Sequence, residues 1–483
     1  MTYQNFYEKW YKDHKNYTIR PYANRILNEE LPKAFIKNNI VVLAAAPNSG
    51  KTLLSIAWME KYLIDNPTHK ILVLTHGQSL LRNQFYNDIK QSRVNFSFEK
   101  ITKSKDFHQA GKQVLITLPH TIINVIDEVN SFNVLIVDEA HHFYYAEDGM
   151  VARIIDRYKF EKQLLLTGTP AIFVAHKMEI IAVALEELIE GEWASDPIIV
   201  ISNSTYDIKE KDFNASDELK KEVKLDKAET FETLNRLLTI IERYMSKTGW
   251  TNSIQSLGKT MIVAKNTSQA KDIQIYFNSF KIETLISTYN TDRHSDIINR
   301  FIEDDINIII VVDRGILGFN LPTLVNIIDM KCGKNISNLF QLFNRITRLH
   351  PEGNQKYFFK IVPESHENEY LYMLSAAISL IFKDNYIKYN GTPDELVIPI
   401  LKIPMKQEDN GKKNKGKAGW KFEPIKYIDI PVYRMWKQSN ENFSWNTLKS
   451  IHKDMYHRRW SEYTIEVNYQ YCLETVKNYY KIA

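Results

Sequence analysis

The stretch that decides the fold is Ala46-Pro47-Asn48-Ser49-Gly50-Lys51-Thr52, which follows an apolar run from Ile40 to Ala44. The run predicts a buried strand, and a loop that closes on Gly-Lys-Thr predicts the start of a helix. Such a loop turns backbone N–H groups and the positive end of the helix toward an anion. Lys51 is then expected to reach the terminal phosphates of a nucleotide, and the Thr52 hydroxyl to ligate Mg²⁺. The predicted phosphate-binding residues are Pro47, Asn48, Ser49, Gly50, Lys51 and Thr52.

A second polar stretch, Asp138-Glu139-Ala140-His141, follows the apolar run from Val134 to Val137. Open parallel sheets bind ligands at the carboxyl ends of their strands, so this stretch is expected beside the phosphate loop. A carboxylate at that place suits Mg²⁺ and an attacking water. We therefore predict that Asp138 ligates the metal with Thr52, and that Glu139 orients and deprotonates the water.

Composition indicates a large enzyme with more than one domain. The chain has 483 residues, of which 44% are hydrophobic and 12% aromatic, enough for two or three cores. Its two cysteines, Cys332 and Cys472, are too few for a disulfide framework or a cysteine-rich zinc site. No apolar stretch approaches ~20 residues and the N-terminus has no signal-peptide pattern, so we expect a cytoplasmic protein without a membrane partner.

Apolar runs of strand length fall into two successive arrays, which predicts an α/β protein with two parallel sheets. The first array adds a helical pattern from Ser79 to Ile89, and the second has no phosphate loop of its own. A helical stretch of mixed charge, roughly Glu218 to Met245, is expected between them. The predicted strands are Lys70 to Thr75, Val114 to Thr117, Val134 to Val137 and Gln163 to Leu166, then Thr260 to Val263, Thr284 to Ser287, Ile306 to Val312, Leu324 to Met330 and Lys356 to Ile361.

Taken in order, the polar stretches resemble the motifs of superfamily 2 helicases and translocases of the DEAH-box kind. The resemblance runs from about Arg20 to about Val362. The matching stretches are Ala45 to Thr52 (motif I), Thr75 and His76 (Ia), Asp138 to His141 (II), Thr167 to Pro170 (III), Met261 to Ala270 (IV), Asp313 to Pro322 (V) and Gln341 to Arg348 (VI).

The resemblance implies two tandem RecA-like P-loop NTPase domains and a small C-terminal accessory domain, mostly helical. We expect the first RecA-like domain at 1–205, a linker helix and the second RecA-like domain at 206–390, and a basic linker with the accessory domain at 391–483. It also implies ATP and Mg²⁺ as cofactors, and nucleic acid as the partner that stimulates hydrolysis.

Two arginines of the second array are candidates to supply positive charge to the transition state of ATP hydrolysis. Arg345 and Arg348 are spaced i, i+3, which predicts that they share one face of a helix, and guanidinium groups bind phosphate oxygens bidentately. Gln341, one helical turn earlier, resembles the family glutamine that contacts nucleotide or water. If these groups complete the ATP site only when the two domains close, hydrolysis can be coupled to stepping along a strand.

Further roles follow from the resemblance alone. The upstream segment Arg20-Pro21-Tyr22-Ala23 resembles one that contacts the nucleotide, so Tyr22 joins the nucleotide-binding set together with Gly318 of motif V. The residues implied in contacting nucleic acid or coupling it to ATP are Thr75, His76, His141, Thr167, Thr169, Lys265 and Gly315.

Several positions depart from the family pattern, among them Ala45 at the first glycine of motif I and Asp313 at the threonine that commonly opens motif V. Asn48 and Asn344 stand where relatives often carry glycine, and asparagine is the residue that best tolerates positive φ after glycine, so both turns are expected to form. Ala23 replaces the glutamine that reads adenine, so loose base selectivity is expected.

The tail from Leu401 onward has 16 Lys and Arg against 9 Asp and Glu, a surplus of +7, whereas the whole chain has a net charge of +4. With the tryptophans at 420, 436, 445 and 460, this composition suits either a nucleic-acid accessory module or a small helical domain with an aromatic core.

Three functions remain open from the sequence. The first is an ATP-driven helicase or translocase, with single-stranded or branched DNA favoured over RNA. The second is the motor subunit of a restriction or other nuclease system, whose nuclease would be another chain. The third is a nucleotide-switch scaffold with a helicase fold. Protein partners cannot be deduced, and a monomer is compatible with the sequence.

Overall fold

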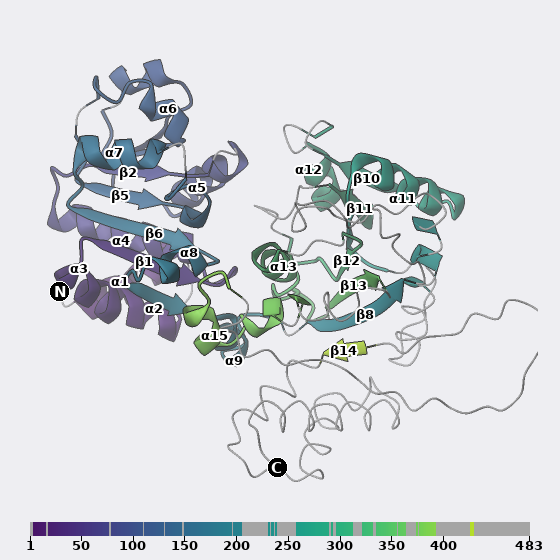
Figure 1. Ribbon diagram of the computed structural model, residues 1–483. Helices are drawn as coiled ribbons and strands as arrows, with labels where there is room; N and C mark the ends of the chain where they lie inside the picture. Colours follow the sequence, from purple (N-terminus) through teal and green to yellow (C-terminus); the bar gives the residue numbers. More distant parts are fainter. Residues whose placement is uncertain are drawn as a thin grey trace, which may run out of the picture. The chain divides into compact units, whose positions relative to one another are not determined.

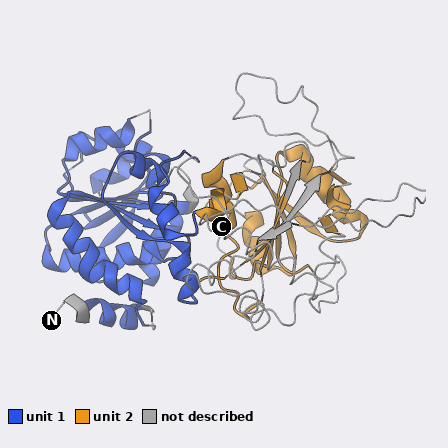
Figure 2. Cartoon of the chain, turned by 60° about the horizontal axis from the view of Figure 1, so that its bottom comes forward, with its two compact units in different colours: residues 1–193, 380–396 blue, residues 194–379, 397–483 orange. Residues whose placement is uncertain are grey.

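The structure is a computed structural model in which two compact units divide the chain (Figures 1 and 2). Unit 1 comprises 1–193 and 380–396, and unit 2 comprises 194–379 and 397–483. The residues described are 3–15, 18–76, 79–109, 111–129, 131–146, 149–195, 197–204, 230–231, 233–235, 237–238, 257–288, 291–292, 296–312, 321–331, 335–354, 356–363, 373–374, 376–392 and 426–428.

Unit 1 is built on a parallel sheet of seven strands in the order β3-β4-β2-β5-β6-β1-β7. Its strands are β1 (Ile40–Ala45), β2 (Ile71–Leu74), β3 (Phe98–Lys100), β4 (Val114–Thr117), β5 (Val134–Val137), β6 (Lys162–Thr167) and β7 (Ile180–Val183). The central strands are continuous apolar runs whose residues are buried, because helices lie on both sides of the sheet (Figure 2).

The helices of unit 1 include one segment from far along the chain, α15, which packs on α8, β7 and α9. The longer helices are α1 (Tyr3–Lys15), α4 (Lys51–Asp65), α5 (Ser79–Gln91) and α7 (Met150–Tyr158). The shorter ones are α2 (Pro21–Arg25), the π-helix η1 (Ile26–Glu30), α3 (Leu31–Lys37), the 3₁₀ helices η2 (Ser104–Gln109) and η3 (Ala140–His142), α6 (Pro119–Ile123), α8 (Ala171–Ala175), α9 (Leu185–Glu190) and α15 (Lys383–Lys388).

Unit 2 has a second seven-stranded sheet, in the order β10-β11-β9-β12-β13-β8-β14. All its neighbours are parallel except β14, which pairs antiparallel with β8. Its strands are β8 (Ile198–Ser204), β9 (Thr260–Val263), β10 (Thr284–Ser287), β11 (Ile308–Val311), β12 (Asn326–Asp329), β13 (Tyr357–Pro363) and β14 (Lys426–Ile428), and its described helices include α11 (Thr267–Ser279), α12 (Asp296–Glu303) and α13 (Ile336–Phe343).

The two sheets confirm the predicted fold class and every strand expected from an apolar run. Sequence reasoning missed β3, β7, β8 and β14, which are edge strands or their neighbours. Of the helix expected at 218–245, the described pieces, 230–231, 233–235 and 237–238, are helical. The accessory domain at 391–483 lies outside the described residues, apart from 391–392 and β14. The three domain boundaries remain a prediction.

Candidate functional site

Strand order brings four of the predicted motifs to one edge of the unit 1 sheet. Strands β2, β5, β6 and β1 are consecutive neighbours, with Leu74 paired to Val137 and Ala44 to Thr167. Motifs Ia, II, III and I follow or end these strands in that spatial order. Polar groups from four separate parts of the chain therefore gather at the carboxyl ends of adjacent strands, where such sheets bind ligands.

The loop after β1 has the backbone of an anion cradle. Asn48 has φ of 76° and Gly50 has φ of 73°, both left-handed, and the Ser49 N–H donates to the Ala46 carbonyl at 3.1 Å. Asn48 therefore adopts the left-handed backbone conformation that glycine would adopt, as expected. Helix α4 begins at Lys51 with no side-chain cap hydrogen bond, so N–H groups of its first turn are available to an anion.

Tyr22 and Arg20 support this loop from the N-terminal segment. Tyr22 is 2% exposed and its hydroxyl donates to the Ser49 carbonyl at 2.5 Å. Arg20 Nη1 donates to the Asn48 carbonyl at 3.4 Å and to the Tyr22 hydroxyl at 3.1 Å. Burial raises the pKa of Tyr22, which keeps its hydroxyl a neutral donor. Tyr22 thus contacts the loop itself; a direct contact with nucleotide remains a prediction.

Asp138 is a buried carboxylate with an unused oxygen. It follows β5, is 7% exposed, and its Oδ1 has no hydrogen-bond partner within the described residues. Burial, reinforced by the charge of Glu139, raises the pKa of Asp138 to about 7. A divalent cation would offset this penalty, so Asp138 and the Thr52 hydroxyl fit a Mg²⁺ site by the chemistry of their oxygens.

Glu139 links the phosphate loop to motif III. Its Oε1 lies 3.3 Å from Lys51 Nζ and its Oε2 lies 3.6 Å from His141 Nδ1. His141 Nδ1 in turn lies 2.9 Å from Thr167 Oγ1, which accepts a hydrogen bond from the Thr169 N–H at 3.0 Å. Burial lowers the pKa of His141 to about 3, so the ring is neutral at physiological pH. Five of the predicted site residues therefore form one continuous polar network.

Motif Ia reaches the same network through imidazole rings that contact one another at tilted angles. His76 follows β2, and its ring centroid lies 4.6 Å from that of His142, which lies 3.9 Å from that of His141. Thr75 is fully buried, and its N–H donates to the Thr117 carbonyl at 3.1 Å. His142 was not among the predicted site residues, because a histidine pair in sequence is more often structural than functional.

Motif III is held by the segment that returns to unit 1. Tyr386 of α15 is 1% exposed, and its hydroxyl donates to the Gly168 carbonyl at 3.1 Å. The Glu186 N–H donates to the Ile381 carbonyl at 3.0 Å, and Glu186 Oε2 accepts from the Lys383 N–H at 3.0 Å. No local sequence pattern could reveal these contacts, because their partners lie about two hundred residues apart along the chain.

The arginines of unit 2 lie in a turn and not on a helix face. Helix α13 carries the buried Gln341 but ends at Phe343, and Arg345 and Arg348 follow it. The prediction that they share a helix face is therefore wrong. Asn344 has φ of −65°, so positive φ is not required there, and its Nδ2 donates to the Phe340 carbonyl at 2.6 Å. The Phe340 carbonyl also accepts from the Asn344 N–H at 3.0 Å, whereas the Arg345 N–H donates to the Leu342 carbonyl at 3.0 Å, only three residues back, so the chain leaves the α-helix there.

Burial, together with the Arg345 guanidinium, lowers the pKa of Arg348 to about 9, so Arg348 remains charged at pH 7. A buried guanidinium that is repelled by a like charge is stabilised by an anionic ligand. Lys265 follows β9, and its N–H donates to Gln269 Oε1 at 2.8 Å. Gly315 and Gly318 of motif V lie outside the described residues.

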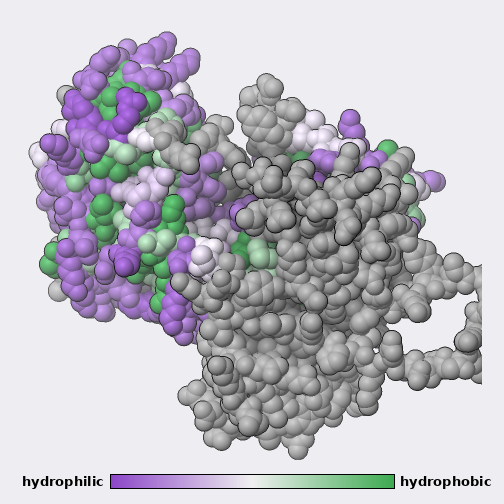
Figure 3. Space-filling model, viewed as in Figure 1, coloured by the Kyte–Doolittle hydropathy of each residue, from purple (hydrophilic) through white to green (hydrophobic). Residues whose placement is uncertain are grey.

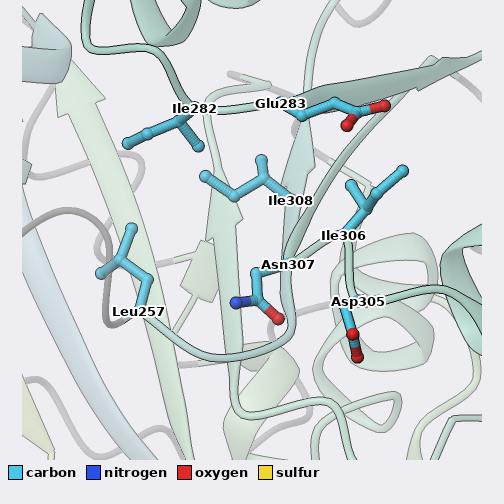
Figure 4. A pocket seen from close by; sticks show the side chains of 7 residues that line it. All are labelled: Leu257, Ile282, Glu283, Asp305, Ile306, Asn307 and Ile308. Carbon is cyan, nitrogen blue, oxygen red and sulfur yellow. The ribbon is translucent and has the colours of Figure 1, made fainter.

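A surface hollow of about 270 Å³ in unit 2 is not a second nucleotide site (Figure 4). Its lining comes from the segments that precede β9, β10 and β11, at the amino ends of the strands. It also carries the carboxylates of Glu283 and Asp305, which repel phosphate. The lining residues are Leu257, Ile282, Glu283, Asp305, Ile306, Asn307 and Ile308.

The described part of the chain contains no group of three or more His, Cys, Asp or Glu side chains able to hold a metal ion. None of its helices combines the length and apolar character that crossing a bilayer requires. On the face shown in Figure 3 the described surface of unit 1 is mainly hydrophilic, with separate hydrophobic patches.

Comparison with known proteins agrees with this geometry. Residues 16–172 match the family model of the Type III restriction enzyme, res subunit, and residues 232–350 match that of the helicase conserved C-terminal domain. The first match contains motifs I to III and the second contains motifs IV to VI.

Two solved structures share the fold. The ATP-dependent Type ISP restriction-modification enzyme LlaBIII bound to DNA is 15% identical with a TM-score of 0.57, over 76% of this chain and 30% of that one. S. cerevisiae Dbp5 bound to RNA and ADP BeF3 is 14% identical with a TM-score of 0.53, over 77% of this chain and 90% of that one. The chain thus spans less than a third of the length of the restriction-modification enzyme.

Proposed function

We infer that the chain is a superfamily 2 helicase with two RecA-like domains, and we propose that it acts as an ATP-dependent helicase or translocase of nucleic acid. The observation that carries this proposal is the network from Lys51 through Glu139 and His141 to Thr167, beside an uncapped helix start. This network joins a phosphate cradle to a candidate base and then to the turn of motif III. A chain with such a link can convert the state of a phosphate into movement of a loop.

The loop of Pro47 to Gly50 would bind the phosphates of ATP through its backbone, with Lys51 adding its charge. Bound Mg²⁺ would neutralise the β and γ phosphates, and Thr52 with Asp138 are the residues that would hold it. The unused Asp138 Oδ1 supports this assignment. The DEAH form of motif II, Asp138 to His141, belongs to the same proposal.

Glu139 would act as the general base once ATP is present. Its carboxylate pairs with Lys51 at 3.3 Å. Phosphate oxygens carry more negative charge than one carboxylate, so they would draw the Lys51 ammonium toward themselves. Glu139 would then orient water and accept its proton, while His141 keeps the carboxylate connected to Thr167.

Unit 2 would supply Arg345 and Arg348 to the transition state, with Gln341 contacting nucleotide or water. If the arginines reach the phosphates only when the two units close on ATP, the rate of hydrolysis depends on the arrangement of the units. A motor requires such a dependence. Nucleic acid bound by motifs Ia, III and V, through residues such as Thr75, Thr169 and Gly315, would then be moved along with that arrangement.

DNA is the proposed substrate, with RNA as the alternative outcome of the test. The match to a restriction-enzyme subunit favours DNA and also supports a second candidate, the motor subunit of a restriction system. The intact network around Lys51 and Glu139 argues against the third candidate function, a nucleotide-switch scaffold that does not hydrolyse ATP.

The test is ATP hydrolysis by the full chain with single-stranded DNA, branched DNA, duplex DNA and RNA in parallel. The proposal predicts that at least one DNA raises the turnover rate by tenfold or more over the nucleic-acid-free rate. Stimulation by RNA alone would replace DNA with RNA, and no change with any of the four would contradict the proposal. DNA cleavage on adding a nuclease partner would promote the restriction candidate.

A further inference from the structure

The tripeptide Trp193 to Ser195 is one of three places at which the chain passes between the units, since unit 1 ends its first stretch at 193 and unit 2 begins at 194. Its two ends are anchored in different units. Ala194 between them is 4% exposed. Adjacent Cα atoms are about 3.8 Å apart across a planar peptide, so this link is short and a displacement of one end is felt at the other.

On the unit 1 side, Trp193 packs on the residues that support the phosphate loop. Its ring centroid lies 5.3 Å from that of Tyr22, and the Arg20 guanidinium carbon lies 5.7 Å from the ring centroid. These are the two side chains whose polar groups bind the carbonyls of Ser49 and Asn48. Displacing the indole therefore loosens the loop without touching it.

The place of Trp193 is fixed by its surroundings. Arg25 of α2 binds Glu187 of α9 through two contacts, at 3.1 and 3.2 Å, which fastens the helix carrying Tyr22 to the helix that leads into Trp193. A Cβ added at Gly191 would meet the Trp193 ring at 2.4 Å, closer than real Cβ contacts come. Alanine fits the backbone at position 191, because φ of Gly191 is −84°. Gly191→Ala is therefore expected to act by displacing the Trp193 indole.

On the unit 2 side, Ser195 binds the turn that carries the two arginines. Its N–H donates to the Thr347 carbonyl at 2.6 Å and its hydroxyl donates to the Arg348 carbonyl at 2.9 Å. Both acceptors belong to the backbone that orients Arg345 and Arg348. A shift of Ser195 therefore changes where these guanidinium groups point.

We propose that Trp193 and Ser195 are positioning residues of ATP hydrolysis, which couple the phosphate loop to the arginine turn through the chain itself. Phosphate binding moves the carbonyls of Asn48 and Ser49, Tyr22 and Arg20 follow them, and the indole passes the shift along two peptide units to Ser195. This inference rests on the proposed function, and it assigns a path that the motifs do not contain.

The test is a double-mutant cycle between Tyr22→Phe and Ser195→Ala. The first variant removes the hydroxyl bound to Ser49, and the second removes the hydroxyl bound to Arg348. Tyr22→Phe should raise the dissociation constant of ATP about fivefold, and Ser195→Ala should lower kcat about fivefold with KM unchanged, each the effect of one buried hydrogen bond. The two residues have no direct contact, so independent effects would multiply.

The proposal predicts that the fold-change of kcat/KM in the double variant differs by threefold or more from the product of the two single fold-changes. In a Gly191→Ala background, with the indole displaced, this difference should vanish. In a Gly111→Ala background it should persist, because an added Cβ there meets nothing within 4 Å. Ser195→Thr, which keeps the hydroxyl, should restore kcat. Multiplication within twofold, or a departure that survives Gly191→Ala, would overturn the proposal.

The same cycle is measured in the dissociation constant of a non-hydrolysable ATP analogue with Mg²⁺. A wild-type chain that binds the analogue but does not hydrolyse ATP would contradict the proposed function, while the cycle in binding still decides the coupling. Thermal unfolding of every variant reports loss of fold. If Gly191→Ala fails to fold, Trp193→Phe, whose smaller ring cannot fill the contact with Tyr22, replaces it.

Discussion

The helix starts after β1 and after β9 differ in how their backbone N–H groups are satisfied. After β1 the chain makes a turn with left-handed residues at Asn48 and Gly50, and α4 begins without a side-chain cap. After β9, Asn266 accepts a hydrogen bond from the Gln269 N–H at 2.9 Å, and Gln269 Oε1 accepts one from the Lys265 N–H at 2.8 Å. The second helix is capped by its own side chains, as in a capping box.

This difference shows why two units of the same architecture have different roles. An uncapped helix start leaves all its donors for phosphate, whereas the Asn266 side chain already occupies the Gln269 N–H of α11. Unit 1 also holds charges of both signs, in Lys51, Glu139 and Asp138, while the turn after α13 concentrates the positive charge of Arg345 and Arg348. Unit 1 is therefore suited to bind a nucleotide, and unit 2 to stabilise negative charge.

The largest effect is expected from Lys51→Ala, which removes the charge at the phosphate loop and leaves Glu139 without this cation. ATP turnover should fall below detection, measured as phosphate release. Lys271→Ala, at an exposed lysine of α11, is the matched control in unit 2 and should leave ATP affinity unchanged. Turnover within tenfold of wild type in Lys51→Ala would contradict the assignment of the nucleotide to unit 1.

Glu139→Gln should abolish turnover while ATP still binds, because the amide keeps the shape of the side chain but cannot accept the proton of water. Equilibrium binding of a fluorescent ATP analogue and single-turnover hydrolysis separate the two steps. The control is Glu179→Gln, at an exposed carboxylate before β7. Equal loss of binding and turnover would show that Glu139 holds the loop instead of acting on water.

Arg345→Ala should slow hydrolysis by roughly 10²- to 10³-fold with little change in ATP affinity, since its charge acts on the transition state. Arg300→Ala, which removes an exposed arginine paired with Asp304 on α12, should leave the rate unchanged. A large rise in the dissociation constant of ATP with kcat preserved would mean that Arg345 binds the ground state.

The smallest effect is expected from Asn266→Ala, which removes the cap of α11. The free energy of unfolding of unit 2 should fall by about 1 kcal/mol, measured by urea denaturation, with ATP affinity unchanged. Tighter ATP binding in this variant would contradict the comparison, because it would mean that the freed helix start of unit 2 binds phosphate.

Much of unit 1 could be predicted because its signals are local. Apolar runs such as Ile71–Leu74 and Val134–Val137 mark buried parallel strands, and polar residues directly after them must lie at one edge of the sheet. The gathering of Lys51, Asp138 and Thr167 follows from that rule alone.

The remaining features depend on contacts between distant segments or on where a helix stops. The spacing of Arg345 and Arg348 fits a helix, but α13 ends at Phe343. The next two N–H groups, of Arg345 and Ile346, bind carbonyls three residues back instead of four. The contacts of Tyr386 with Gly168 and of Ser195 with Arg348 join residues 218 and 153 positions apart, and no pattern within one segment encodes them.

The central claim is that one ATP site is assembled from the phosphate loop of unit 1 and the arginines of unit 2. A structure of the full chain with Mg²⁺, ADP and beryllium fluoride tests it most directly. The account predicts a guanidinium of Arg345 or Arg348 within hydrogen-bond distance, about 3 Å, of the fluoride group that stands for the γ phosphate. A nucleotide bound at Lys51 with both arginines directed to solvent, in a closed complex with DNA, would contradict it.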